Sequence, residues 1–159
     1  MNRNFLLAGL AVAAAMVAGL LYLNRGAHLV LEGGIQKVRI QPLDENSALL
    51  IADFRAHNPS DLPFVIRSVD VFLDRADGSE IEGTTVSEPD IRRIFEALPE
   101  LGPRYNPGLI ARDQIRSKET SDRMVASRFE VPASELAVRQ NVRIRFTEID
   151  GATSEIKEK

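Results

Sequence analysis

The sequence predicts an all-β, antiparallel domain with one inserted amphipathic helix, preceded by a single N-terminal transmembrane helix. Three observations predict this fold class: an uncharged apolar run near the N-terminus, several later segments in which apolar and polar residues alternate, and one segment with helical periodicity. No linker rich in Gly, Ser or Pro divides the chain after the apolar run, so we expect one folded domain of ordinary size.

The N-terminal apolar run covers Phe5 to Leu23, and the short basic segment 1–4 precedes it. At about 1.5 Å of rise per residue, a helix of this length spans roughly 28 Å, close to the hydrocarbon core of a bilayer. A cleaved signal peptide is the alternative, with Val17-Ala18-Gly19 as its candidate cleavage sequence. Cleavage there would leave an apolar stub, which favours a retained anchor. Residues 24–34 then lead from the membrane into the domain.

The start of the chain also bears on location. A short basic segment followed at once by an apolar core is typical of exported chains, which favours a periplasmic or otherwise extracytoplasmic domain. Basic residues near the two ends of the run do not decide the orientation, because Arg3 faces Arg25, Lys37 and Arg39. The chain has no cysteine, so no disulfide supports the fold and acylation at a cysteine is excluded.

Alternating apolar residues predict half-buried strands within the domain, which we place at residues 35–151. From Leu50 to Ala56 every second residue is apolar, with Asp53 and Arg55 between them, so this strand should have one dry face and one wet face. The same alternation returns from Val125 to Val131 and from Val142 to Phe146. Two further segments are rich in β-formers: Ile35 to Leu43 and Val65 to Leu73.

Turn sequences mark the ends of these strands. Asp77-Gly78 predicts a hairpin between Val65 to Leu73 and Ser79 to Val86, because Asp-Gly tolerates a positive φ at a hairpin tip. A second Asp-Gly, at Asp150-Gly151, follows the last clearly alternating strand. We therefore expect residues 152–159 to form a frayed polar tail.

One helix is predicted between the strands. Ser87 is a capping residue with acidic residues after it, and the apolar residues from Ile91 to Leu98 recur at helical spacing. This stripe should pack on the sheet, and Pro99 should end the helix. The polar face should lie in water and carries Arg92, Arg93 and Glu96.

The segment with the most specific pattern follows the strand that ends at Ala56. Asn58-Pro59 ends a strand firmly, since proline has no N–H for the ladder, and Pro63 then fixes the entry of the next strand at Phe64. A strand that runs into Asn-Pro, a short loop and an aromatic-bearing strand resembles the late embryogenesis abundant group 2 family, also called the water-stress and hypersensitive-response domain. The similarity extends to the hairpin from Val69 to Gly83.

The resemblance implies a β-sandwich of fibronectin or immunoglobulin type, often membrane-tethered or exported. It also implies a role in stress or desiccation protection rather than catalysis, and it supplies no catalytic or cofactor-binding residues. Asn58, Pro59, Pro63 and Phe64 are expected to act as a structural turn.

Catalytic and metal-binding patterns are weak in this sequence. Asp53, Arg55 and His57 share one face of a strand, but no nucleophile or second base is tied to them by spacing, so we interpret them as a solvated face. The acidic residues around the predicted hairpin lack the pattern of a calcium loop. We therefore predict no enzyme, no metal and no cofactor; the acidic residues concerned are Asp74, Asp77, Glu80 and Glu82.

Charge suggests which partners to expect. The formal net charge is −3, and the densest basic stretch is mixed with acidic residues and has no aromatic side chains, which argues against nucleic acid. Anionic lipid head groups or an acidic partner remain possible ligands of that stretch. The candidate partner surface combines helix and loop residues: Arg92, Arg93, Glu96, Arg112 and Arg116.

Three functions remain open from the sequence. The leading one is a non-enzymatic, membrane-tethered protein that gives stress or desiccation protection at the cell envelope. The second is an adaptor or assembly module that binds an envelope protein. The third is a lipid-binding periplasmic β-domain.

Overall fold

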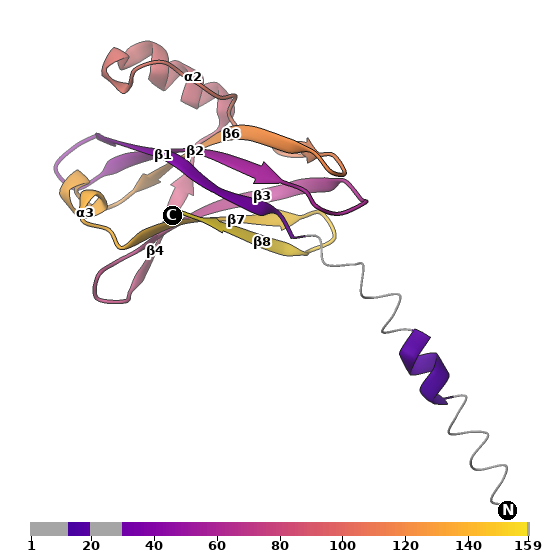
Figure 1. Ribbon diagram of the computed structural model, residues 1–159. Helices are drawn as coiled ribbons and strands as arrows, with labels where there is room; N and C mark the ends of the chain where they lie inside the picture. The colour runs from indigo at the N-terminus through magenta and orange to yellow at the C-terminus, as the bar shows by residue number, and fades with distance from the viewer. Residues whose placement is uncertain (1–12, 20–29, 159) are drawn as a thin grey trace, which may run out of the picture.

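The protein is described by a computed structural model that covers residues 13–19 and 30–158 (Figure 1). Residues 13–19, which belong to the predicted apolar run, are helical. The remainder of the predicted anchor Phe5 to Leu23, segment 1–4 and residues 24–29 of the predicted lead-in lie outside the described residues. Within the described ranges, no helix has both the length and the apolar character needed to cross a bilayer.

From Glu32 onward the described chain forms strands joined by two short helices and one 3₁₀ turn. In chain order the elements are β1 (Glu32–Pro42), β2 (Ala48–His57), β3 (Phe64–Asp74), β4 (Glu80–Thr85), α2 (Glu88–Ala97), η1 (Pro99–Leu101), β5 (Gln114–Ile115), β6 (Thr120–Phe129), α3 (Ala133–Ala137), β7 (Asn141–Glu148) and β8 (Thr153–Lys157).

The strands form a β-sandwich whose ladders are antiparallel, as predicted. One layer has the order β1-β2-β6 and the other β3-β7-β8, and Figure 1 shows them stacked. Strand β4 joins the two layers at one side, because it pairs with β3 as far as Gly83 and with β6 from Thr84 onward. At the other side, β1 and β8 meet in a parallel bridge between Ile35 and Glu158.

The main core lies between the two layers. On β2 the predicted dry face is confirmed, since Leu50 and Phe54 are buried in this core, and the Phe54 ring lies 5.4 Å from that of Phe146 on β7. A bulge in β3 between Ile66 and Ser68 shifts the alternation of the strand by one residue. Even-numbered side chains face the core before the bulge, and odd-numbered side chains face it after the bulge. Ile66 before the bulge and Val71 after it both reach the core.

Helix α2 covers the outer face of the β1-β2-β6 layer, as Figure 1 shows. Ile91 packs there with Leu49 and Ile51 of β2, which confirms that the apolar stripe of the helix faces the sheet. The predicted wet face of β2 is wrong for this part of the strand. Asp53 also lies on that face and is only 3% exposed, because the helix and the chain that follows it exclude water.

The predicted hairpin and the predicted helix start are both present. Arg75 N–H donates to Ser79 O across the β3–β4 turn, and Gly78 has a φ of 83°. Ser87 caps α2 by accepting a hydrogen bond from Asp90 N–H. The predicted polar tail is wrong, because residues 153–157 form β8 on the edge of β7 and the side chain of Ile156 is buried in the main core.

Candidate functional site

The Asn-Pro segment forms a closed turn at the end of β2. Asn58 is fully buried, and its Nδ2 donates to the carbonyls of Leu62 (2.7 Å) and Ile115 (3.0 Å). Its Oδ1 accepts from both the N–H and the hydroxyl of Ser60. The amide therefore ties the loop to β5 and has no free hydrogen-bonding group for a ligand.

The other residues of this segment complete the turn. Phe64 is fully buried in the main core, and Pro63, which is exposed, leads into it. The carbonyl of Pro59 accepts a hydrogen bond from Lys118 Nζ. The structure thus places the four motif residues in the turn and at the start of β3, and none of them lines the cleft described below.

The two halves of the predicted partner surface lie on different elements. Arg92 and Arg93 are exposed on α2, where they pair with Glu88 and Asp90 of the same helix, and Glu96 is exposed beside them. The second half, Arg112 and Arg116, lies in the loops before and after β5. No hydrogen bond or ion pair connects the two halves in the described part of the chain.

The polar residues of β2 each have their own partner. Asp53 Oδ2 accepts from Arg39 Nη2 at 2.6 Å, and its Oδ1 accepts from Asn106 Nδ2 at 2.9 Å. Arg55 forms a bidentate ion pair with Asp122, and the His57 ring contacts the Thr120 hydroxyl at 3.0 Å. These three side chains therefore do not form one site, although all three belong to β2.

The acidic residues of the β3–β4 hairpin bind an arginine. The carboxylates of Asp74 and Glu80 both accept from the Arg143 guanidinium, and these hydrogen bonds, that of Asp74 first, raise the pKa of Arg143 above its usual value. Across residues 13–19 and 30–158, no three His, Asp or Glu side chains are grouped so that they could hold a metal ion.

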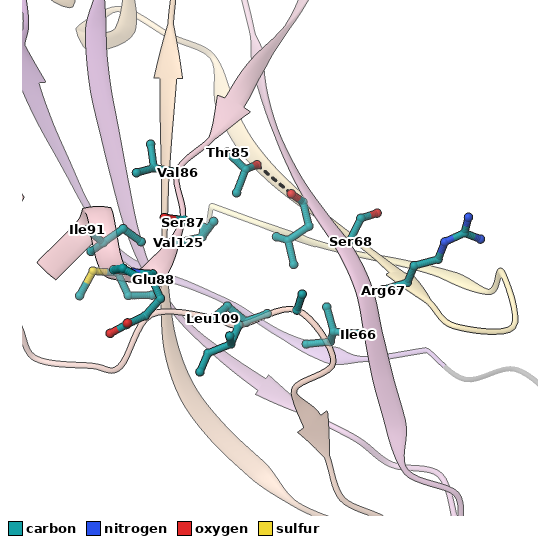
Figure 2. Close-up of a pocket in the computed structure, with 15 residues that line it drawn as sticks. Ile66, Arg67, Ser68, Thr85, Val86, Ser87, Glu88, Ile91, Leu109 and Val125 are labelled. Atoms are coloured by element: carbon teal, nitrogen blue, oxygen red, sulfur yellow. Dashed lines mark hydrogen bonds between the residues drawn. The ribbon is translucent and has the colours of Figure 1, made fainter.

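A cleft opens at the side of the sandwich where β4 changes layers. The ladder of β4 with β3 ends at the pair Val71–Gly83, so the part of β3 before Val71 has separated from β4. A cavity of about 350 Å³ lies between this part of β3, the start of α2 and β6 (Figure 2). We call this cavity the cleft. A shallower hollow of about 640 Å³ shares Ser68, Val69 and Thr85 with it and continues along β3 and β4.

The cleft is lined mainly by hydrocarbon side chains from four segments, which Figure 2 shows on both sides of the opening. Ile66 and Val125 belong to the main core, whereas Ile91 and Met124 belong to the cluster beneath α2. The cleft therefore reaches both hydrophobic clusters. Its apolar lining includes Ile66, Val69, Val86, Ile91, Leu109 and Val125.

Backbone groups around the cleft are largely paired. The Thr85 hydroxyl donates to Val69 O at 2.8 Å, in place of the ladder bond lost where β4 turns away. On the facing wall, Leu109 N–H donates to Met124 O, and Met124 N–H donates to Pro107 O. Because these polar groups are satisfied, the walls offer apolar contacts rather than a free strand edge.

Polar side chains occur at the rim. Arg67 and Ser68 of β3 lie on one side, and Ser87 and Glu88 at the start of α2 lie on the other (Figure 2). Hydrogen bonds from Arg92 and then Arg104 hold the pKa of the Glu88 carboxyl below its usual value. The one carboxylate at the cleft is therefore ionised near neutral pH and already engaged.

Sequence reasoning did not find the cleft. Its lining residues come from positions 66–69, 85–91, 109–111 and 124–125, and only the crossing of β4 brings them together. Two signals were present in the sequence. One is the broken alternation of β3, which marks the bulge, and the other is a glycine at the position where β4 changes layers.

Comparison with known proteins gives no family for this chain. No protein-family model matches it, and no curated protein matches it. Two solved structures are similar in outline at 14% sequence identity. One is the crystal structure of an uncharacterized β-sandwich protein from Clostridium difficile, with a TM-score of 0.41, which covers 82% of this chain and 86% of that chain. The other is the Iho670 flagellar-like filament, with a TM-score of 0.29, covering 97% and 95%. We draw no functional conclusion from either.

Proposed function

We propose that this protein is a non-enzymatic binding domain that holds the apolar chain of a lipid in the cleft. The observation that carries the proposal is the side opening at which β4 leaves β3. The cleft there is lined by members of both hydrophobic clusters, and Val69, Val86 and Leu109 on its walls are only partly buried. A folded protein would ordinarily close such an opening, because exposed hydrocarbon costs free energy in water.

The size and lining of the cleft support a lipid ligand. Its volume of about 350 Å³ lies at the lower end of the range of small-molecule sites, and those sites are mostly apolar with a few polar groups at fixed positions. The facing side chains of Ile66, Leu109 and Val125 can contact a hydrocarbon chain from several sides. At about 0.8 kcal/mol per buried CH₂ group, a chain of modest length gains enough free energy to stay bound.

The chemistry of the cleft favours binding over catalysis. Its lining is hydrocarbon, and its carboxylate, Glu88, is held by two arginines instead of being poised to take a proton. The side chains at the rim can therefore orient a ligand, but they have no stated role in breaking a bond.

The location of the protein is part of the proposal. We propose that Phe5 to Leu23 anchors the chain in a membrane, with a sandwich of fibronectin or immunoglobulin type on the extracytoplasmic side. A domain tethered in this way would meet lipids leaving the bilayer at high local concentration.

The test is to look for bound lipid directly. The full-length chain is purified in non-ionic detergent and extracted with organic solvent, and the extract is analysed by mass spectrometry. Val69→Trp fills the cleft from β3, whereas Val138→Trp makes the same change at an exposed valine outside it. We expect an enriched lipid from the unmodified chain and from Val138→Trp, and several-fold less from Val69→Trp. Equal amounts from all three proteins, or a clean extract, would contradict the proposal.

The stress role implied by the family resemblance is a separate proposal that rests on the Asn58-Pro59 motif. Its test is survival after drying or osmotic upshift in cells with and without the protein. Equal survival would count against it.

A further inference from the structure

We infer that the lipid taken by the cleft is anionic, and that its head group binds arginines from the segments beside one end of the cleft: Arg67, Arg112 and Arg123. This inference rests on the proposed function and adds the chemical class of the ligand. A carboxylate and a phosphate are the two head groups that an arginine cluster recognises.

The three arginines come from the three segments that meet at one end of the cleft. Arg67 follows Ile66 on β3 and is itself part of the rim. Arg112 N–H donates to Ile66 O at 2.9 Å, so the backbones of Arg67 and Arg112 are neighbours. Arg123 precedes Met124 on the facing strand, and Met124 lines the cleft.

The charge at this end is positive and largely uncompensated. In the described part of the chain, neither Arg67 nor Arg112 has a carboxylate within ion-pairing distance, and both are exposed. Arg123 is 25% exposed, and its nearest carboxylate is Asp113 at 3.9 Å. Asp113 also accepts a hydrogen bond from Ile110 N–H at 3.1 Å. Among the described residues, Asp113 is therefore the one carboxylate within ion-pairing distance of any of these three arginines, and it is already engaged.

The opposite end of the cleft is different. The single carboxylate of Glu88 there is paired with two guanidinium groups, those of Arg92 and Arg104. An anionic head group at that end would have to compete with Glu88 for arginines that are already paired. The two ends of the cleft therefore differ, because Arg67 and Arg112 have no carboxylate partner among the described residues.

The orientation of Arg67 fits a ligand whose tail is inside and whose head is outside. Figure 2 shows its side chain extending from β3 away from Leu109 and Val125, which contribute to the apolar lining. The guanidinium therefore lies in water, outside the apolar lining of the cleft. A lipid with its chain between the sheets could place a charged head group there without burying the charge.

The experiment compares three probes that have the same hydrocarbon chain and a photoreactive group at its far end. They are a fatty acid, an alkyl phosphate and a fatty alcohol, each titrated against the full-length chain in non-ionic detergent and irradiated. Peptide mass spectrometry then reports the labelled residues and the half-saturating concentration. The Arg67→Gln/Arg112→Gln variant is compared with Arg93→Gln/Arg128→Gln, which changes two exposed arginines that neither line the cleft nor pair with Glu88.

We expect at least one anionic probe to label the cleft at a concentration about tenfold lower than the alcohol, as the loss of a charge-assisted hydrogen bond would predict. The Arg67→Gln/Arg112→Gln variant should lose this preference, and the control variant should keep it. Which anionic probe binds more tightly identifies the head group as carboxylate or phosphate. Equal labelling by all three probes, or a preference that survives in Arg67→Gln/Arg112→Gln, would overturn the inference. Either result would still support lipid binding in the cleft. If no probe labels the cleft, the proposed function itself fails.

Discussion

The buried pair between Arg39 of β1 and Asp53 of β2 gives the sharpest stability prediction. The two side chains are 9% and 5% exposed, and Arg39 Nη2 lies 2.6 Å from Asp53 Oδ2. Arg39 also donates to the carbonyls of Leu101 and Pro103, so the pair fastens the chain that follows α2 onto the outer face of the sheet. The perturbation is Asp53→Ala, which leaves this guanidinium buried without its carboxylate.

The magnitude follows from what Arg39 keeps and loses. Removing one partner of a buried ion pair typically costs about 3–5 kcal/mol of unfolding free energy. Arg39 retains its two carbonyl acceptors and its position over the Phe95 ring at 4.9 Å, which places the loss at the low end of that range. Asn106 also loses its acceptor, which adds about 1 kcal/mol. We therefore expect a loss of about 3–4 kcal/mol.

The assay is urea unfolding of the full-length chain, followed by far-ultraviolet circular dichroism. The midpoint should fall at an unchanged slope. Asp122→Ala is the matched control, because it removes a carboxylate from an exposed arginine pair on the adjacent strand and should change the midpoint far less. The double variant Arg39→Met/Asp53→Leu should recover most of the loss, since it leaves no unpaired charge. A loss below about 1 kcal/mol for Asp53→Ala would refute the reasoning.

Three further predictions concern other parts of the domain. Gly83→Ala should lower the free energy of unfolding by about 1–3 kcal/mol, because the new Cβ would meet Ser127 Oγ and lie 2.7 Å from the Phe129 ring; urea unfolding checks this, and an unchanged midpoint would argue against the close approach. Burial acts to raise the pKa of Glu155, but the hydrogen bond from Arg145 and the charges of Arg145 and Arg143 outweigh burial and lower that pKa. The ionised Glu155 carboxylate therefore stabilises the fold at pH values above its unfolded pKa of about 4.3. That stabilisation should be lost as the pH falls through the lower folded value; Glu155→Gln should reduce the acid-induced loss measured by thermal unfolding at several pH values, and an identical pH profile would contradict this. Reversing the exposed charges of α2 with Arg92→Glu/Arg93→Glu should abolish cross-linking to an envelope protein if the adaptor proposal holds, whereas undiminished cross-linking would exclude that surface.

The sequence predicted the elements of this fold better than their surroundings. Alternation located the inner faces of β2, β6 and β7, and the stripe from Ile91 to Leu98 located α2 and the side that it buries. Both signals are local, because they depend only on the period of the element. The outer face of β2 was misread because the covering layer comes from a helix more than thirty residues later. Leu49 and Ile51 are apolar on that face, but alternation does not say which element covers them.

Two further features depended on long-range geometry. Strand β8 was missed because its segment is short and rich in charge, and it is held by its pairing with β7 and the burial of Ile156. The cleft exists because β4 pairs with one layer through Gly83 and with the other from Thr84 onward. A sequence pattern indicates that a residue is in a strand. It does not indicate with which strand that residue pairs, or where a strand changes its pairing partner.

The most direct test of the lipid proposal is a crystal structure of the protein saturated with a medium-chain fatty acid. The proposal predicts electron density for the hydrocarbon chain inside the cleft, in contact with Ile66, Leu109 and Val125, with the carboxylate near Arg67 and Arg112. Density for the chain elsewhere on the protein, or an empty cleft at saturating fatty acid, would contradict it.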